Sequence, residues 1–404
     1  SAVLFSPFII LGALALVLII SGLLEFRSHQ LVLSNIPVRI HVNGTRGKSS
    51  VTRLIAAGLR AGGKRTFANT TGTAPRVIDA EGIDRIIHRL RSPSICEQVR
   101  LLKYFSAEKP DVVVMECMAV QPQYQWISEH QMVKSDIGVI TNARPDHLDE
   151  MGPTDVDVVR SLCNSVPIDG ALITAEEKHK NILEKVAEQN GSEFLHSDEG
   201  SITDSELNKF SYIEHPQNIA IALDVCEKMG IKRDVALNGM HSVKPDLGAL
   251  IVWKLKGENG SLQFVNGMAA NDPVSTLQIW KFVIDRYPTT SGSAVFFNSR
   301  DDRPLRTNQM LELTFEEIKP EHFIIRGDKI ASKVNRLIHH SPETKVQIFP
   351  LDDKIDSVSK SKTLHSPVLP ITISHFLLSL SFPSIVRSSS NFIFPENLET
   401  NSDS

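Results

Sequence analysis

The stretch PVRIHVNGTRGKSS, from Pro37 to Ser50, joins a short apolar run to a glycine-rich turn and a Lys-Ser pair. This order predicts a buried strand, a phosphate-binding loop and a helix start, whose free N–H groups and partial positive charge attract anions. Lys48 is then placed to hold β- and γ-phosphates, and the Ser49 hydroxyl to bind Mg²⁺. The common form of this loop has glycine where this chain has Val42. A glycine-rich turn without a ligand is the alternative interpretation.

The segments that follow alternate between apolar runs and helical patterns. Continuous apolar runs of this length, separated by helices, indicate a parallel sheet covered on both faces. The fold class is therefore α/β, with a central nucleotide-binding domain over residues 37–245. The expected strands are 37–42, 65–68, 111–117, 136–141 and 170–175, and the expected helices are 49–61, 178–189 and 217–228.

Polar side chains stand where two of these strands end. Glu116 closes the run DVVVMEC, and the loop TNARPDHLDEMG (141–152) directly follows another strand. Ligands of open α/β sheets bind beyond the carboxyl ends of the strands, and a carboxylate there is suited to Mg²⁺. A surface acid and a solvated turn are the alternatives, but three such features at strand ends favour a site.

A second region of alternation begins after a break near residues 239–248. It predicts a smaller α/β domain over residues 246–350, apparently incomplete at its end. Residues 351–404 are rich in serine, interrupted by proline and without regular periodicity, so they are predicted to be a disordered or aberrant tail. A second membrane span over 368–386 is disfavoured by Pro370 and Pro383.

The first 24 residues carry no charge. A membrane helix needs roughly 20 apolar residues, so we expect a transmembrane anchor at 1–24 and a linker at 25–36. Arg27 and Arg39 follow the apolar run, which places the remaining chain in the cytoplasm by the positive-inside rule. A cleaved signal peptide is the alternative, although neither a basic start nor a small-residue cleavage site is visible. A buried helix of a soluble protein is a further alternative.

Composition excludes some partners. The formal net charge is −4, so no general basic field recruits nucleic acid or anionic lipid. The four cysteines are widely spaced, which is typical of reduced thiols rather than of a metal site or a disulfide framework.

Taken together, NGTRGKSS, Glu116 and TNARPDHLDEMG resemble the Mur ligase superfamily. Its members share a variant phosphate loop, G-T-x-G-K-[ST], which accounts for Val42, and a T-N-x-x-x-D-H-L-D motif. EHPQNIAIA (214–222) resembles the helix start whose Asn contacts adenine, which indicates Asn218. NSRDDRPLRT (298–307) resembles the loop that closes over the substrates.

Within that superfamily the chain is similar to the ligase subunit of poly-γ-glutamate synthase in capsule synthesis, of the PgsB/CapB type. The resemblance rests on the anchor before the loop, on ECMAVQP (116–122) and on NSRDDRPLRT. Only residues 25–36 separate the anchor from the first strand, which leaves no room for the UDP-sugar domain of peptidoglycan ligases.

The resemblance implies ATP-dependent amide formation through an acyl phosphate, with glutamate and a growing poly-γ-glutamate chain as substrates. It also implies small membrane subunits as partners. Lys48, His147, Arg300 and Arg303 would be catalytic, and Ser49, Glu116 and His147 would hold Mg²⁺. The residues expected to bind ATP are Asn43, Gly44, Thr45, Arg46, Gly47, Lys48, Ser49, Ser50, Asn142 and Asn218.

The chain departs from the superfamily pattern in two places. The segment DVVRSLCNSV (157–166) has no Lys where Mur ligases usually carry a carbamylated one, so a second metal site would need other residues. Asp272 is the polar residue left in the turn where other members have His. A folyl-polyglutamate synthase and a membrane-tethered ATPase that ligates nothing remain the alternative functions.

Overall fold

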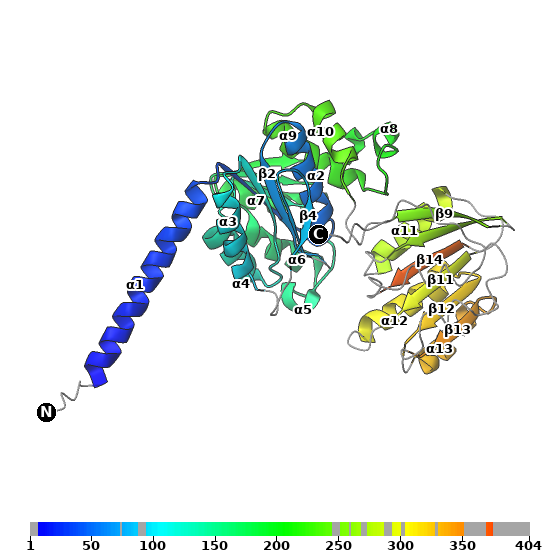
Figure 1. Cartoon of the computed structure of the whole chain (residues 1–404). Helices are drawn as coiled ribbons and strands as arrows, with labels where there is room; N and C mark the ends of the chain where they lie inside the picture. Colours follow the sequence, from blue (N-terminus) through cyan, green and yellow to red (C-terminus); the bar gives the residue numbers. More distant parts are fainter. Residues whose placement is uncertain are drawn as a thin grey trace, which may run out of the picture. The chain divides into compact units, whose positions relative to one another are not determined.

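The computed structural model describes residues 7–72, 75–87, 94–244, 251–257, 260–267, 273–286, 293–299, 304–327, 330–350 and 369–374. The chain divides into two compact units, Ser1–Leu247 and Gly248–Ser404. Each unit is built around its own sheet (Figure 1).

The first element is the long helix α1 (Pro7–Ser34) (Figure 1). Its apolar stretch is exposed, and its length and composition suffice for a membrane span, a test that a signal sequence would also meet. The expected linker 25–36 is helical as far as Ser34, because neither Gly nor Pro interrupts residues 23–36.

The first unit contains an eight-stranded sheet in the order β4-β3-β2-β5-β1-β6-β7-β8. The pairs from β2 to β8 are parallel, which confirms the predicted α/β class, whereas β3 and β4 form an antiparallel edge. The strands are β1 (Val38–Asn43), β2 (Thr66–Thr70), β3 (Arg76–Ile78), β4 (Asp84–Ile86), β5 (Val112–Glu116), β6 (Ile137–Ile140), β7 (Ala171–Thr174) and β8 (Glu193–His196).

Helices flank this sheet. The helix after the phosphate loop, α2, is buried from Val51 to Leu59, because it packs against β2, α9 and α10. The helices are α2 (Lys48–Ala61), α3 (Cys96–Ala107), α4 (Pro122–Ile127), α5 (Leu148–Met151), α6 (Asp155–Leu162), α7 (Lys180–Gln189), α8 (Asp204–Leu207), α9 (Pro216–Lys228) and α10 (Arg233–His241), with a π-helical turn η1 (Ser128–Val133).

The second unit has a six-stranded sheet in the order β13-β12-β11-β14-β10-β9. Its core includes Val295 and Phe297 of β11, Phe323 of β12 and Val334 of α13. The elements are β9 (Ile251–Gly257), β10 (Gly260–Asn266), α11 (Pro273–Arg286), β11 (Ser293–Asn298), α12 (Pro304–Leu313), the π-helical turn η4 (Thr314–Ile318), β12 (His322–Arg326), α13 (Ala331–Leu337), β13 (Lys345–Phe349) and β14 (Leu369–Ser374).

Strand β14 corrects the prediction that no regular structure follows residue 350. Leu369–Ser374 lies between β10 and β11 and runs parallel to both. Leu369, Ile371 and Ile373 alternate with other residues at the period of a strand, but the serine-rich, proline-interrupted composition of the tail had favoured disorder. Pro370 is in register with Ala294 of β11, whereas pairing with β10 begins only at Ile371.

Candidate functional site

The phosphate loop joins β1 to α2 and depends on two glycines with positive φ. Gly44 has φ 129° and Gly47 has φ 80°. A Cβ atom on Gly44 would lie 2.1 Å from Thr141 Oγ1, and one on Gly47 would lie 2.6 Å from Asn218 Oδ1. Val42 is fully buried within β1. Val42 is therefore a strand residue and not part of the turn, which starts two residues later at Gly44.

The start of α2 is an open anion-binding end. Gly47 caps the helix without a side-chain hydrogen bond, and the first helical N–H groups have no partner within a helix. The Lys48 ammonium donates to Gly44 O at 2.6 Å, which folds its side chain back across the loop. A helix N-terminus beside an ammonium is suited to phosphate.

Glu116 ends β5 beside this loop. Its carboxylate accepts a hydrogen bond from Ser49 Oγ at 2.8 Å, and two from Thr71, through N and Oγ1, each at 2.8 Å. Burial raises the pKa of Glu116 above its usual value, although the charge of Lys48 and these hydrogen bonds oppose that shift. A carboxylate beside a hydroxyl offers the hard oxygen ligands that Mg²⁺ and Mn²⁺ prefer.

Asn142 follows β6 and braces the loop. It accepts a hydrogen bond from Thr45 Oγ1 at 2.8 Å and donates one from Nδ2 to Arg46 O at 3.1 Å. Its carbonyl also accepts from Thr45 N at 3.0 Å. The side chain is buried and does not line the pocket, so its observed contacts shape the phosphate loop.

His147 lies in the same loop as Asn142 but on its exposed side. The residue adopts a left-handed conformation with φ 48°, and its side chain is 45% exposed. Its Nε2 lies 4.0 Å from Asp146 Oδ2, and Asp146 Oδ2 lies 3.6 Å from Arg46 Nη2. The imidazole is thus accessible at the rim.

A pocket of about 310 Å³ collects these groups at the carboxyl edge of the sheet. It brings Lys48, Glu116 and His147 together from three different strand ends, as the sequence predicted for this edge. Among the described residues no three His, Cys, Asp or Glu side chains form a metal cage. A metal here would be coordinated partly by protein side chains and partly by oxygens of the bound phosphates, which is how Mg²⁺ is commonly held. The lining residues are Asn43, Gly44, Thr45, Lys48, Thr71, Gly72, Glu116, Cys117, Met118, Ala119, Val120, Asp146, His147 and Met151.

Asn218 lies behind the phosphate loop instead of in this pocket. It sits in the first turn of α9, is buried, and donates from Nδ2 to Glu214 Oε1 at 2.7 Å. Its Oδ1 lies against Gly47. Burial raises the pKa of Glu214, although the hydrogen bond from Asn218 opposes that shift.

Two predicted catalytic residues, Arg300 and Arg303, lie outside the described residues, as does Asp272. The adjoining Ser299 is described, and its backbone N–H donates to Arg326 O at 2.8 Å.

The sequence reading missed Thr71, which holds Glu116 through two hydrogen bonds. The available signal was NTTGT (69–73) directly after the expected strand 65–68, a small polar run at the same edge of the sheet. The wall formed by Cys117–Val120 and Met151 was also missed, since apolar residues carry no chemical signal.

Comparison with known families agrees with this geometry. Residues 42–253 match the Mur ligase middle domain, and residues 252–365 match the poly-gamma-glutamate synthase CapB C-terminal domain. The second match runs past residue 350, into the stretch expected to be aberrant.

Two relatives are similar over most of the chain. Capsule biosynthesis protein CapB of Bacillus anthracis is 38% identical over 326 residues, which are 80% of this chain and 70% of that protein. PGA synthase CapB of Bacillus subtilis (strain 168) is 35% identical over 314 residues, which are 77% of this chain and 80% of that protein.

Solved structures of folate ligases share the fold. E. coli FolC in complex with DHPP and ADP aligns with a TM-score of 0.61 and 15% identity, over 86% of this chain and 88% of that one. A bifunctional folylpolyglutamate synthase/dihydrofolate synthase from Yersinia pestis, complexed with AMPPNP and Mn ion, has the same TM-score and identity, over 87% and 88%. At this identity the likeness concerns the fold alone.

Proposed function

Because this chain belongs to the Mur ligase superfamily and, within it, to the CapB family of poly-γ-glutamate synthases, we propose that it joins glutamate units through their γ-carboxyl groups at the expense of ATP. The observation that carries the proposal is the pocket that unites Lys48 of the phosphate loop with Glu116 and His147. A nucleotide's phosphates and a carboxylate substrate meet at such an edge.

The reaction has two steps. A carboxylate of the acceptor attacks the γ-phosphorus of ATP, which forms an acyl phosphate and releases ADP. The amino group of a glutamate then attacks the acyl carbon, phosphate leaves with the electron pair, and the amine loses a proton. Catalysis of phosphoryl transfer consists mostly of positioning and charge neutralisation. Lys48 and the first amides of α2 perform that task by holding the β- and γ-phosphates.

The metal is proposed to be Mg²⁺. When bound it neutralises phosphate charge and orients the oxygens. Ser49 and Glu116 are its proposed ligands because their side chains are already in contact, and His147 is proposed as a third because it lines the same pocket. Asn218 is proposed to face the adenine, and Arg300 and Arg303 to bind a phosphate or glutamate carboxylate bidentately.

Membrane attachment is part of the proposal. The exposed apolar part of α1 supports an anchor, and Arg27 on its C-terminal flank supports a cytoplasmic location for the catalytic units. Small membrane subunits are proposed partners, because a growing polymer end must be held near the anchored enzyme. Nucleic acid is not a proposed partner.

The test is ADP release by membranes that contain the full chain, with and without glutamate. Dependence on glutamate is expected. ADP release at the same rate without glutamate would favour a tethered ATPase that ligates nothing. A folate ligase shares this fold, so dihydrofolate serves as the competing acceptor, and ligation of dihydrofolate in preference to glutamate would contradict the proposal.

A further inference from the structure

The C-terminal end of α1 is packed into the first unit. Leu33 and Ile36 are buried in one cluster with Phe105 of α3 and with Val113 and Met115 of β5. Both β5 residues belong to the strand that ends at Glu116, so the end of the helix packs on the strand that carries this residue.

A guanidinium closes the polar side of this junction. Arg39 Nη1 donates to Leu33 O at 2.7 Å, and Nε donates to Lys134 O at 2.9 Å. Its Nη2 pairs with Asp136 Oδ1 at 3.2 Å. Leu33 O also accepts from Ile36 N at 3.1 Å, so Arg39 adds a second hydrogen bond at the end of α1 and ties that end to residues 134–136, between η1 and β6.

Met132 of η1 and Lys134 hold α1 one helical turn earlier. His29 Nε2 lies 2.8 Å from Met132 O, and Lys134 Nζ donates to Gln30 Oε1 at 3.0 Å. The docked stretch of α1 thus runs from His29 to Ile36, and we name it, with Arg39, the helix joint. Contacts on several sides of one helix end make a stiff connection.

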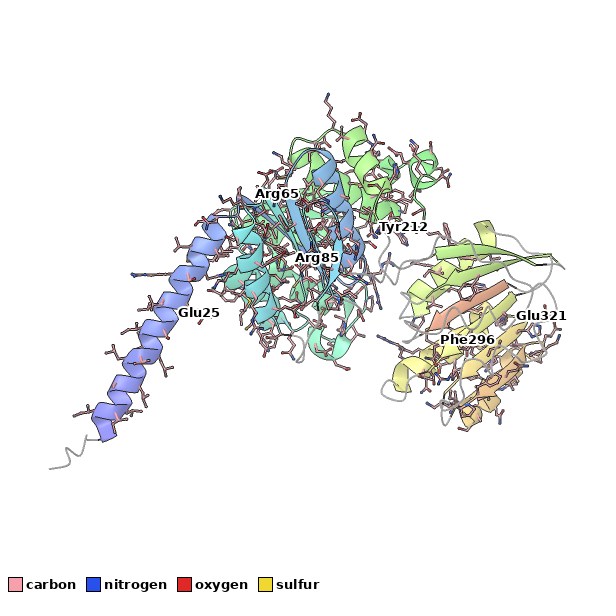
Figure 2. The ribbon with its side chains drawn as sticks, viewed as in Figure 1. Glu25, Arg65, Arg85, Tyr212, Phe296 and Glu321 are labelled. Atoms are coloured by element: carbon pink, nitrogen blue, oxygen red, sulfur yellow. The ribbon has the colours of Figure 1, made fainter. Side chains whose placement is uncertain are left out.

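The helix joint begins close to the end of the uncharged run. Leu24 is the last residue of that run, and the rise of a helix places His29 about 7 Å further along the axis. Glu25 stands on the part of α1 that extends away from the sheet (Figure 2). The headgroup layer on each side of a bilayer is about 5–8 Å thick. Docking therefore starts at the outer limit of the headgroups.

This inference rests on the membrane attachment proposed above. We propose that the helix joint seats the first unit directly on the lipid headgroups, with the turn at residues 131–134 against the membrane. Gln131 and Lys134 are exposed there, and an ammonium suits lipid phosphates.

The helix joint would hold the pocket at a fixed distance from the membrane surface. Three residues separate α1 from β1, and β1 ends at the phosphate loop. A strand of six residues extends about 20 Å, and β1 is paired on both sides. The pocket then lies at the edge of the sheet opposite the helix joint, presented to a polymer end held by membrane partners.

The experiment places the full chain in nanodiscs of phosphatidylcholine and phosphatidylglycerol that carry a nitroxide on the headgroup. A fluorophore is attached to Gln131→Cys or to Asp149→Cys, in a Cys96→Ser background because Cys96 is exposed. Asp149 follows the opposite end of β6. We expect strong quenching at position 131 and little at position 149. Equal quenching at the two positions would overturn the proposal.

Two variants show whether the helix joint is responsible. Inserting Gly-Ser-Gly-Ser between Arg27 and Ser28 keeps both the membrane-spanning part of α1 and the helix joint but joins them by a flexible linker. Arg39→Gln removes the ion pair of Arg39 with Asp136. Loss of the difference in quenching is expected for both, and an unchanged difference in both contradicts the proposal. ADP release with glutamate is measured on the samples labelled at position 131, because Asp149 lies in the loop TNARPDHLDEMG at the pocket. If quenching is as expected but ADP release does not depend on glutamate, the proposed function is rejected, whereas the proposed contact of the first unit with the headgroups still holds.

Discussion

Glu116 is the residue whose protonation state matters most in the pocket. Burial raises its pKa, against the influence of Lys48 and three hydrogen bonds. In the protein without bound metal or nucleotide, the neutral acid is therefore favoured more strongly than it is in the unfolded chain. The stability from that form is present at low pH and is lost as the pH rises through the raised pKa.

Glu116→Gln tests this balance. The amide imitates the neutral acid, so we expect the variant without ligand to melt higher at neutral pH, by about 0.5–2 kcal/mol of stability. Stabilisation by Mg²⁺ and a non-hydrolysable ATP analogue should be lost, because an amide is a weak metal ligand. Thermal unfolding measures both effects. The control Glu116→Ala leaves Ser49 and Thr71 without an acceptor and should melt lower. A Gln variant that still gains stability from metal and nucleotide would show that Glu116 is not near the metal.

Activity should depend on the ionised form of the same carboxyl. Because the pKa of Glu116 is raised in the free protein, kcat/KM should fall as the pH drops through that raised value. More Mg²⁺ should move this acid limb to lower pH, since the metal competes with the proton for the carboxylate. The measurement is a pH profile at two Mg²⁺ concentrations. An acid limb that does not respond to Mg²⁺ would have another origin.

Lys48→Ala removes the ammonium beside the phosphates. The side chain makes one hydrogen bond within its own loop, so the fold should persist while ATP turnover falls by roughly 100- to 1000-fold. Circular dichroism and ADP release check the two parts. Lys64→Ala, just past α2, is the matched control and should retain turnover. Normal hydrolysis by Lys48→Ala would refute the phosphate-loop assignment.

At the scale of elements, glycines with positive φ at the two ends of α2 are needed for different reasons: Gly44 lies in the phosphate loop before the helix, and Gly63 follows the helix. At Gly44 a side chain would meet both Thr141 and an unfavourable φ, whereas at Gly63 only φ is unfavourable and no atom lies within 4 Å. Gly63→Ala should therefore cost about 1–2 kcal/mol and keep nucleotide binding. Gly44→Ala should displace the loop and lose that binding, as measured by calorimetry with an ATP analogue. Equal affinity in the two variants would contradict the close approach of Gly44 to β6.

Elements with strong periodicity were predictable from the sequence. The strand before the loop, helix α2 and the strand ending at Glu116 were placed within a few residues, because buried parallel strands are continuous apolar runs. Short edge strands such as β3 and β4 have three residues each and no such run. The pairing of α1 with the turn at Met132–Lys134 joins residues about a hundred positions apart, which local pattern cannot reveal.

The ionisable side chains of the site were predictable from the sequence, whereas the residues that hold them in place were not. Lys48, Glu116 and His147 carry motifs and meet in one pocket. Thr71 and the apolar wall contribute by position, which depends on the order of strands in the sheet. Asn142 and Asn218 were expected at the nucleotide. Asn142 forms hydrogen bonds with Thr45 and Arg46 of the loop, whereas Asn218 donates to Glu214 and lies against Gly47.

At the scale of the whole molecule, the last described strand completes the second sheet. Strand β14 lies between β10 and β11, so a chain cut before Leu369 would leave the facing edges of both strands unpaired. We expect this truncation to lower the melting temperature of the second unit and to leave the first unit's nucleotide affinity unchanged. A cut after Ser374, which keeps β14, is the comparison. Calorimetric scans that are identical for the two truncations would contradict the placement of β14.

The central claim is that ATP hydrolysis in the pocket of Lys48 and Glu116 is coupled to glutamate ligation. The most direct measurement counts ADP released and γ-amide bonds formed by the full chain in membranes with its partner subunits. The account predicts one ADP for each γ-amide bond, and the loss of both products in Lys48→Ala. ADP release that continues without glutamate, or that yields no γ-linked product, would contradict it.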